Sequence, residues 1–299
     1  MKIVNVTGAG TPSVFLIEGE ADILFEAGMA FSAELMVENI KRELGGKPLR
    51  AVLLSHSHYD HVAGLPAVRR EWPEVKVYAS KRAQEIMVRP SALTTIRRLS
   101  GEAAEAAGMD WERDYRDEDL RVDVGLKDGD IFEIGDHRIE VLETIGHTKC
   151  SVSYIVDGEL MLCSETVGVI NEKKHYMPSF LVDYKEMERS IEKSSRIPVK
   201  QIILNHYGLV SEEDRPNIWE FLLEKARESR KIMTDVMNRC GSEEESLKEL
   251  EWIFHTGVDK KEQPDEAFDI NAVSMMKTLR RQFPEDFDGS KKGGGSLCS

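Results

Sequence analysis

One short segment, residues 55–61, limits most strongly what this chain can fold into. It reads Ser-His-Ser-His-Tyr-Asp-His and directly follows the apolar run 51–54, which is typical of a buried strand. In an extended chain, residues two apart project to the same side, so the first two histidines can converge on one metal ion. The alternative is that the aspartate only caps a helix and the histidines lie on the surface, yet three of the eight histidines fall within these residues. The predicted metal ligands are His56, His58, Asp60 and His61.

Hydrophobic patterning places this cluster in an α/β protein. Short strand-like runs alternate with a helical pattern at 31–44 that ends at Gly45, as helices tend to end at glycine. Further strand signals fill residues 122–165, and one more strand is expected at 201–204. The first strand-like runs are 14–17, 22–25, 49–54 and 75–78. Strands and helices in this order predict a layered α/β sandwich.

Two helical regions interrupt or follow this sandwich. Residues 81–121 form a predicted helical insertion that passes into a charged connector. Three amphipathic segments after residue 210 predict a C-terminal helical cap, residues 211–289, on a catalytic domain of residues 1–210. The low-complexity segment 290–299 is expected to be a flexible tail.

Composition narrows the partners. The 299 residues carry a net charge of −14, which disfavours nucleic acid and anionic lipid as partners and leaves a small-molecule substrate as the expectation. No apolar run approaches the roughly 20 residues that span a bilayer. The start of the chain lacks the apolar core of a signal peptide, and the four cysteines are scattered, so a cytoplasmic protein with reduced thiols is expected. Composition leaves the oligomeric state open, a dimer included.

Three more metal-capable residues stand where later apolar runs end. His147 follows the run near 141–144, Glu165 follows 160–163, and His206 follows 202–204. Taken singly, either histidine is more typical of an ordinary turn. Taken with the first cluster, they predict that several strand ends deliver ligands to one edge of the sandwich.

These motifs, in this order, resemble the metallo-β-lactamase superfamily over about residues 1–210. The signature His-x-His-x-Asp-His matches 56–61, and Gly-His-Thr matches 146–148. The resemblance implies an αββα sandwich with two divalent metal ions, zinc or iron or manganese, and a hydroxide between them. It implies that Asp60 orients the attacking water and passes a proton to the leaving group. It assigns His56, His58 and His147 to the first metal, Asp60, His61 and His206 to the second, and Glu165 to a bridging position.

Two positions depart from the family pattern. The bridging acid is usually Asp, and this chain has Glu165, whose extra methylene requires the backbone to lie further back or one metal to bind weakly. Where a neighbouring Asp usually ends the second strand, this chain has Glu26. Glu26 is expected either to orient a metal ligand or to be a solvated turn acid.

Hydrolysis is the expected reaction, since two dications activate a shared water and polarise a carbonyl or phosphoryl oxygen. The segments 26–35, 58–61, 77–82 and 274–282 are similar to the thioesterase subgroup of alkylquinolone-signal biosynthesis (2-aminobenzoylacetyl-CoA thioesterase), which implies a thioester or related ester or lactone as substrate. The alternatives are a small-molecule phosphodiesterase, a ligand-binding or regulatory protein with weakened catalysis, and a diiron redox protein. The diiron oxygen reductases of the family usually carry Glu at the position of His58.

Three further residues near the motifs are candidates for substrate contact. They are His175, Tyr176 and Tyr207. Each is equally compatible with an exposed loop position. Cys150 and Cys163 lie in strand-like runs without a base partner and are expected to be buried thiols.

Overall fold

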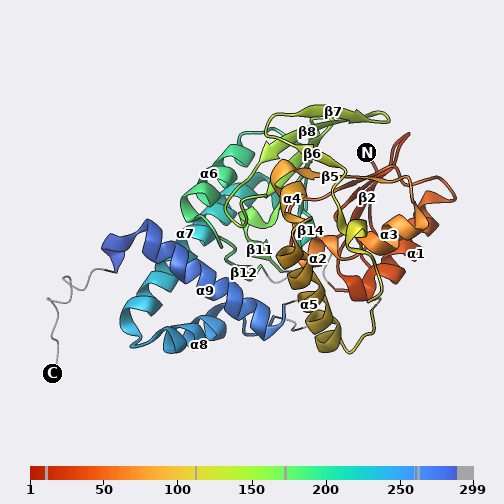
Figure 1. Ribbon diagram of the computed structural model, residues 1–299. Helices are drawn as coiled ribbons and strands as arrows, with labels where there is room; N and C mark the ends of the chain where they lie inside the picture. The colour runs from red at the N-terminus through yellow and green to blue at the C-terminus, as the bar shows by residue number, and fades with distance from the viewer. Residues whose placement is uncertain (11–12, 112, 172–173, 259, 261–262, 288–299) are drawn as a thin grey trace, which may run out of the picture.

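The computed structural model describes residues 1–299 apart from 11–12, 112, 172–173, 259, 261–262 and 288–299. Within these residues two six-stranded sheets face each other, with helices on both outer faces (Figure 1). The first sheet has the order β1 (Ile3–Asn5), β2 (Phe15–Ile17), β3 (Ile23–Phe25), β4 (Ala51–Leu53), β5 (Lys76–Ser80) and β6 (Val124–Leu126). The second has the order β14 (Gly208–Leu209), β13 (Gln201–Leu204), β10 (Leu160–Leu162), β9 (Val152–Val156), β8 (His137–Glu143) and β7 (Ile131–Ile134). The predicted αββα sandwich is confirmed.

The side chains of the first sheet contribute to two hydrophobic clusters, one on each face of the sheet. In β2, Phe15 and Ile17 belong to the cluster between the sheets, whereas Leu16 between them packs under the outer helices. Side chains of a strand point alternately to its two faces, so a strand covered on both sides is apolar throughout. The pairs β3–β4, β4–β5 and β5–β6 are parallel. Their carboxyl ends therefore lie at one edge, where segment 55–61 begins.

Helices α1 to α5 follow or interrupt the strands of the first sheet. Their bounds are α1 (Ala33–Leu44), α2 (Tyr59–Val62), α3 (Leu65–Glu71), α4 (Lys81–Ile86) and α5 (Pro90–Ala107). The predicted helical insertion is thus two helices, since Pro90 starts a new one. α1 ends at Gly45 in the left-handed conformation, as the sequence predicts.

Helices α6 to α9 cover the second sheet. Their bounds are α6 (Tyr184–Ser195), α7 (Ile218–Arg239), α8 (Glu243–Phe254) and α9 (Asp265–Gln282). They share one hydrophobic cluster with β10 and β13, which includes Met187 of α6, Leu222 of α7 and Leu279 of α9. The predicted helical cap is therefore present, while the domain boundary near residue 210 stays a prediction, because both sides of it contribute to this cluster. None of the helices in the described part combines the length and apolarity of a membrane span.

Helix α6 and the two strands of a small hairpin were not predicted. Helix α6 has only Tyr184, Met187 and Ile191 as large buried side chains, because serines fill the rest of its buried face. The segment that follows Glu165 contains a small hairpin, β11 (Val169–Ile170) with β12 (Tyr176–Met177), where the sequence predicts a loop. The predicted flexible tail, 290–299, lies outside the described residues.

Candidate metal centre

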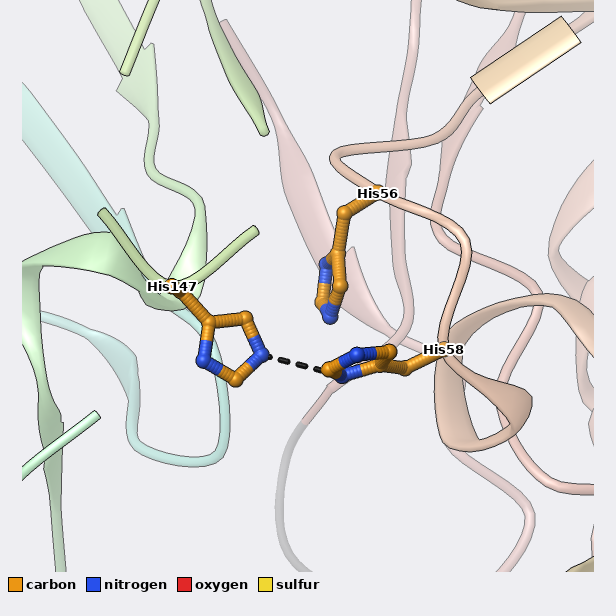
Figure 2. A group of neighbouring side chains, drawn as sticks. All are labelled: His56, His58 and His147. Atoms are coloured by element: carbon orange, nitrogen blue, oxygen red, sulfur yellow. Dashed lines mark hydrogen bonds between the residues drawn. The ribbon is translucent and has the colours of Figure 1, made fainter. Parts of the chain in front are cut away.

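Three histidines from two distant segments converge at the edge of the sandwich. His56 follows β4, His58 precedes α2, and His147 follows β8. Figure 2 shows the three rings turned towards one another, with His147 Nε2 3.0 Å from His58 Nδ1. One nitrogen of each ring lies within 4.8 Å of the others. Imidazole nitrogens at such spacing form a ligand set for zinc, iron or manganese.

Hydrogen bonds behind the rings fix which nitrogen faces this group. The carbonyl oxygen of Ser179 accepts from His147 Nδ1 at 3.0 Å, so the lone pair of that ring is on Nε2, which faces the other candidate ligands. Ser55 Oγ lies 2.9 Å from His56 Nδ1. His56 Nε2 is buried and has no hydrogen-bond partner among the described residues. A buried nitrogen without a partner is costly unless a ligand occupies its lone pair, so these residues fit a metal ion.

A second group lies beside the first and contains the acids. It consists of Asp60, His61, Glu165 and His206, whose ligand atoms lie within 4.8 Å of one another. Glu165 Oε1 lies 2.6 Å from His61 Nε2 and 2.5 Å from His206 Nε2. Its other oxygen lies 3.1 Å from His147 Nε2 of the first group. The longer side chain of Glu165 therefore reaches both groups.

The three-histidine group is electrically neutral. Burial and the neighbouring histidines hold the pKa of His56 well below its usual value. Burial also lowers the pKa of His58, to about 4, and that of His147. Neutral imidazoles are the form that binds metal, so this group needs no proton loss near pH 7.

The second group is charged. Burial opposes ionisation of Asp60 and Glu165, but the adjacent histidines outweigh it and keep both pKa values well below their usual range. The same acids overcome the effect of burial on their partners and raise the pKa of His206 to about 9 and that of His61 well above its usual value. Without a metal, protons on the histidines compensate the carboxylates, and a divalent cation would replace those protons.

Glu26 supports both groups from behind. It is fully buried, and its backbone has a φ of 64°, a strained conformation for a residue other than glycine. Its carboxylate accepts from the backbone N–H of Ser55 at 3.2 Å and from Asn205 Nδ2 at 3.2 Å. Oε1 lies 3.4 Å from His61 Nδ1, which has no hydrogen-bond partner of its own in the described part of the chain. Burial contradicts the solvated-turn alternative, and the Glu26 carboxylate lies where it can orient His61, a candidate ligand.

Sequence reasoning missed three supporting residues, Ser55, Ser179 and Asn205. Ser55 and Asn205 directly precede the ligands His56 and His206, so their position in the chain was an available signal. Asn205 Nδ2 also donates to Ser55 Oγ at 3.2 Å and so joins the two strand ends. Ser179 lies 32 residues from His147 in a segment without a motif, and nothing in the sequence marks it.

A cavity of about 580 Å³ opens above the two groups. The ligand side chains His58, Asp60, His147, Glu165 and His206 line its floor. Its volume lies in the range of small-molecule sites. The ligands therefore face a space large enough for a substrate.

The predicted substrate contacts His175, Tyr176 and Tyr207 are not among the residues that line this cavity. His175 instead donates from Nε2 to the carbonyl oxygen of Phe254 at 2.9 Å and ties the hairpin to α8. Tyr176 is buried in the cluster under the helical cap, and Tyr207 packs against it. Their contact with substrate stays a prediction without support from the geometry.

The family follows from these motifs together with a sequence comparison. Residues 7–162 match the metallo-beta-lactamase superfamily, which is more than half of the chain. The protein belongs to the metallo-beta-lactamase superfamily. The chain is 25% identical to the acyl-coenzyme A thioesterase MBLAC2 of Bos taurus over 244 residues, covering 77% of this chain and 85% of that protein. It is 22% identical to a hydroxyacylglutathione hydrolase of Photobacterium profundum over 242 residues, covering 78% and 80%.

Solved structures share the superfamily fold. The archaeal metallo-beta-lactamase superfamily protein ST1585 from Sulfolobus tokodaii superposes with a TM-score of 0.60 at 18% identity, covering 86% of this chain and 96% of that one. The family protein TTHA1429 from Thermus thermophilus also gives 0.60, at 17% identity over 90% and 88%. These similarities establish the fold and leave the substrate open.

Proposed function

We propose that this protein is a dinuclear metal-dependent hydrolase that cleaves a small-molecule thioester or a related ester or lactone. The observation that carries the proposal is the pair of ligand groups on the cavity floor with Glu165 in contact with both. The relatives named as an acyl-coenzyme A thioesterase and a hydroxyacylglutathione hydrolase support the thioester.

Two groups of residues would hold the metal ions. His56, His58 and His147 form the first site, and Asp60, His61 and His206 form the second, with Glu165 shared between them. When bound, two divalent cations lower the pKa of a shared water and polarise the carbonyl of a substrate. The chain supplies preorganised ligands, since Glu26 and Ser179 already hold the rings in place.

Asp60 is the proposed proton carrier. Its Oδ2 lies 3.3 Å from His61 Nε2 and 3.4 Å from His206 Nε2, and its side chain also lines the cavity. Because its pKa is held well below the usual range, Asp60 is ionised at neutral pH and can accept a hydrogen bond from the attacking water. Asp60 would take one proton from the water as the water attacks and pass that proton to the departing thiolate, which leaves as the thiol.

Cations in the cavity favour an anionic substrate. Lys149 and Arg82 line the space beside the floor. Arg82 Nη1 forms an ion pair with Glu85 Oε2 at 3.5 Å, while Lys149 has no carboxylate partner among the described residues. A phosphate-bearing thiol carrier such as coenzyme A would give Lys149 a counter-charge. The free thiols of Cys150, Cys163 and Cys240 support a reducing, cytoplasmic setting for such a substrate.

A substrate panel on metal-defined protein tests the proposal. We expect turnover of acyl-CoA or acyl-glutathione thioesters that is lost in His58→Ala. It should persist in His137→Gln, whose histidine is buried against Asp157 away from the centre. Cleavage of phosphodiesters without thioester activity would favour the phosphodiesterase alternative and end this proposal. Absence of turnover on every substrate would support the regulatory alternative.

The glutamate at position 165 is proposed to be adapted to its bridging role. Its two oxygens contact histidines of both groups, and a shorter side chain would draw the carboxylate back by about 1.5 Å, the length of one carbon–carbon bond. Glu165→Asp should therefore lower the number of metal ions bound and the rate. A faster enzyme with two tightly bound metals would show that the glutamate is a defect.

A further inference from the structure

The cavity above the metal centre has two helical walls from distant parts of the chain. The α5 wall consists of Ala92, Thr95, Ile96 and Leu99. The α9 wall consists of Ala267, Ile270, Asn271 and Ser274. Both sets have the spacing i, i+3, i+4, i+7, which places each on one face of its helix. One helix belongs to the insertion and the other to the C-terminal cap.

An ion pair joins these two helices. Arg98 of α5 donates from Nη1 to Glu266 Oε1 of α9 at 3.3 Å, over a sequence separation of 168 residues. Figure 1 shows the first turns of α9 beside α5 on the side of the sandwich where the α2 segment lies. The two walls therefore face each other, and the space between them is a slot.

The slot walls carry apolar side chains beside the polar Thr95, Asn271 and Ser274. Ile96 is buried, Leu99 is half-buried, and Ile270 is 45% exposed although it lines the cavity. Ile170 and Leu181 of the hairpin region close a further side. Ile270 therefore presents apolar surface to the cavity, which a ligand can bury.

The charged groups of the cavity belong to its floor and to Arg82 and Lys149. The histidines and carboxylates are on the floor, and Lys149 follows His147 by two residues. A thioester has one apolar half, its acyl chain, and one polar half on the thiol carrier. Desolvating phosphates against Ile96 and Ile270 would be costly, whereas an alkyl chain gains from the same contact.

We propose that the slot between α5 and α9 binds the acyl chain of the substrate, and that Ile96, Leu99 and Ile270 set the length of chain that fits. The proposal rests on the proposed thioester hydrolysis and names the substrate class: thioesters of linear alkyl acids. Chain length is selected by the depth of the slot, since each added methylene is buried until the walls end.

Binding of S-alkyl-CoA thioethers tests this without turnover. These compounds keep the carrier and the chain and cannot be hydrolysed. Calorimetry on metal-loaded protein should show Kd falling by roughly fourfold for each added methylene from ethyl upwards, and then levelling off. Far-UV circular dichroism and Tm confirm that each variant is folded.

Two variants and a control test whether the alkyl chain of the ligand lies in the slot. Ile270→Trp and Leu99→Trp fill the slot and should weaken the longest thioethers at least tenfold while ethyl-CoA binds as before. Ile131→Trp is the control, since Ile131 is 54% exposed on β7 and does not line the cavity. Affinity that does not depend on chain length, an equal loss for every length, or no thioether binding would overturn the proposal. Length-dependent binding without hydrolysis of any thioester would uphold the slot and end the proposed function.

Discussion

Replacing Glu26 by glutamine tests whether the acid behind the ligands matters for metal binding. Glutamine has the same shape and keeps one oxygen for the backbone N–H of Ser55, but it removes the charge beside His61. The carboxylate is fully buried, so solvent does not screen it. The variant therefore isolates one electrostatic contact.

The magnitude follows from the distance. In the metal-free protein, at 3.4 Å and with an effective dielectric constant of about 20, unit charges on Glu26 and protonated His61 interact with roughly 5 kcal/mol; a metal-bound, neutral His61 interacts less strongly with Glu26. Removing a buried charge also removes its desolvation cost, which offsets part of that loss. Outer carboxylates behind metal-bound histidines are worth about 10–100-fold in metal affinity, or roughly 1.4–2.8 kcal/mol. We expect Glu26→Gln to weaken one metal by that factor.

Chelator competition with Zn²⁺ or Mn²⁺, followed by metal analysis, measures both sites. The site containing His61 should weaken, while the three-histidine site changes little. Asp22→Asn is the matched control, because Asp22 is also a buried acid next to β3 but pairs with Lys47 at 2.7 Å, away from the candidate ligands. Two metal ions bound with wild-type affinity in Glu26→Gln would refute the reasoning.

Three further results are expected. Because the pKa of His206 is raised to about 9, metal binding to its group must release protons at pH 7, so the metal affinity of that group should rise with pH towards 9. The metal affinity of the group containing His58, whose pKa is about 4, should vary little above pH 5. Calorimetry in buffers of different ionisation enthalpy measures the protons released, and the same pH dependence for both groups would contradict this prediction. Gly146→Ala should lower the free energy of unfolding, measured in urea, by roughly 1–3 kcal/mol, because the φ of Gly146 is 152° and a Cβ there would lie 2.7 Å from Met187 Cα. Gly45→Ala should lower it less, because Gly45 has a φ of 58° and open space where a Cβ would lie. Lys149→Met should raise KM for acyl-CoA about twofold to fivefold, the worth of an exposed ion pair, and leave an uncharged thioester unaffected; equal changes for both would remove Lys149 from substrate binding.

The grouping of the first candidate ligands could be predicted because the local sequence contains it. His56 and His58 are two residues apart at the end of an apolar strand, and period-two geometry alone puts them on one side. His147 and His206 could be predicted as metal ligands only together with that cluster, because a single histidine after a strand has no distinguishing sequence pattern. The convergence of all of them depends on which strands are neighbours, which the local pattern does not contain.

The parts that could not be predicted depend on tertiary contacts. Helix α6 buries serines where a helix usually buries large apolar side chains, so its periodicity is weak, although Asp183 three residues before Glu186 is an N-capping signal. Ser179 reaches His147 through a loop whose course is set by the hairpin and α6. The slot between α5 and α9 joins segments 168 residues apart, and each helix face alone predicts only ordinary core packing.

The ion pair between Arg98 and Glu266 joins helices α5 and α9, which lie outside both sheets and contain none of the proposed metal ligands. Substitutions in α5 and α9, or a helix lengthened by a turn, would leave every strand register of the sandwich as it is. Under the proposed function, changes in these two helices would alter the acyl group that is accepted and leave the proposed metal ligands in place. Substrate preference and reaction chemistry are then free to evolve at different rates within one gene.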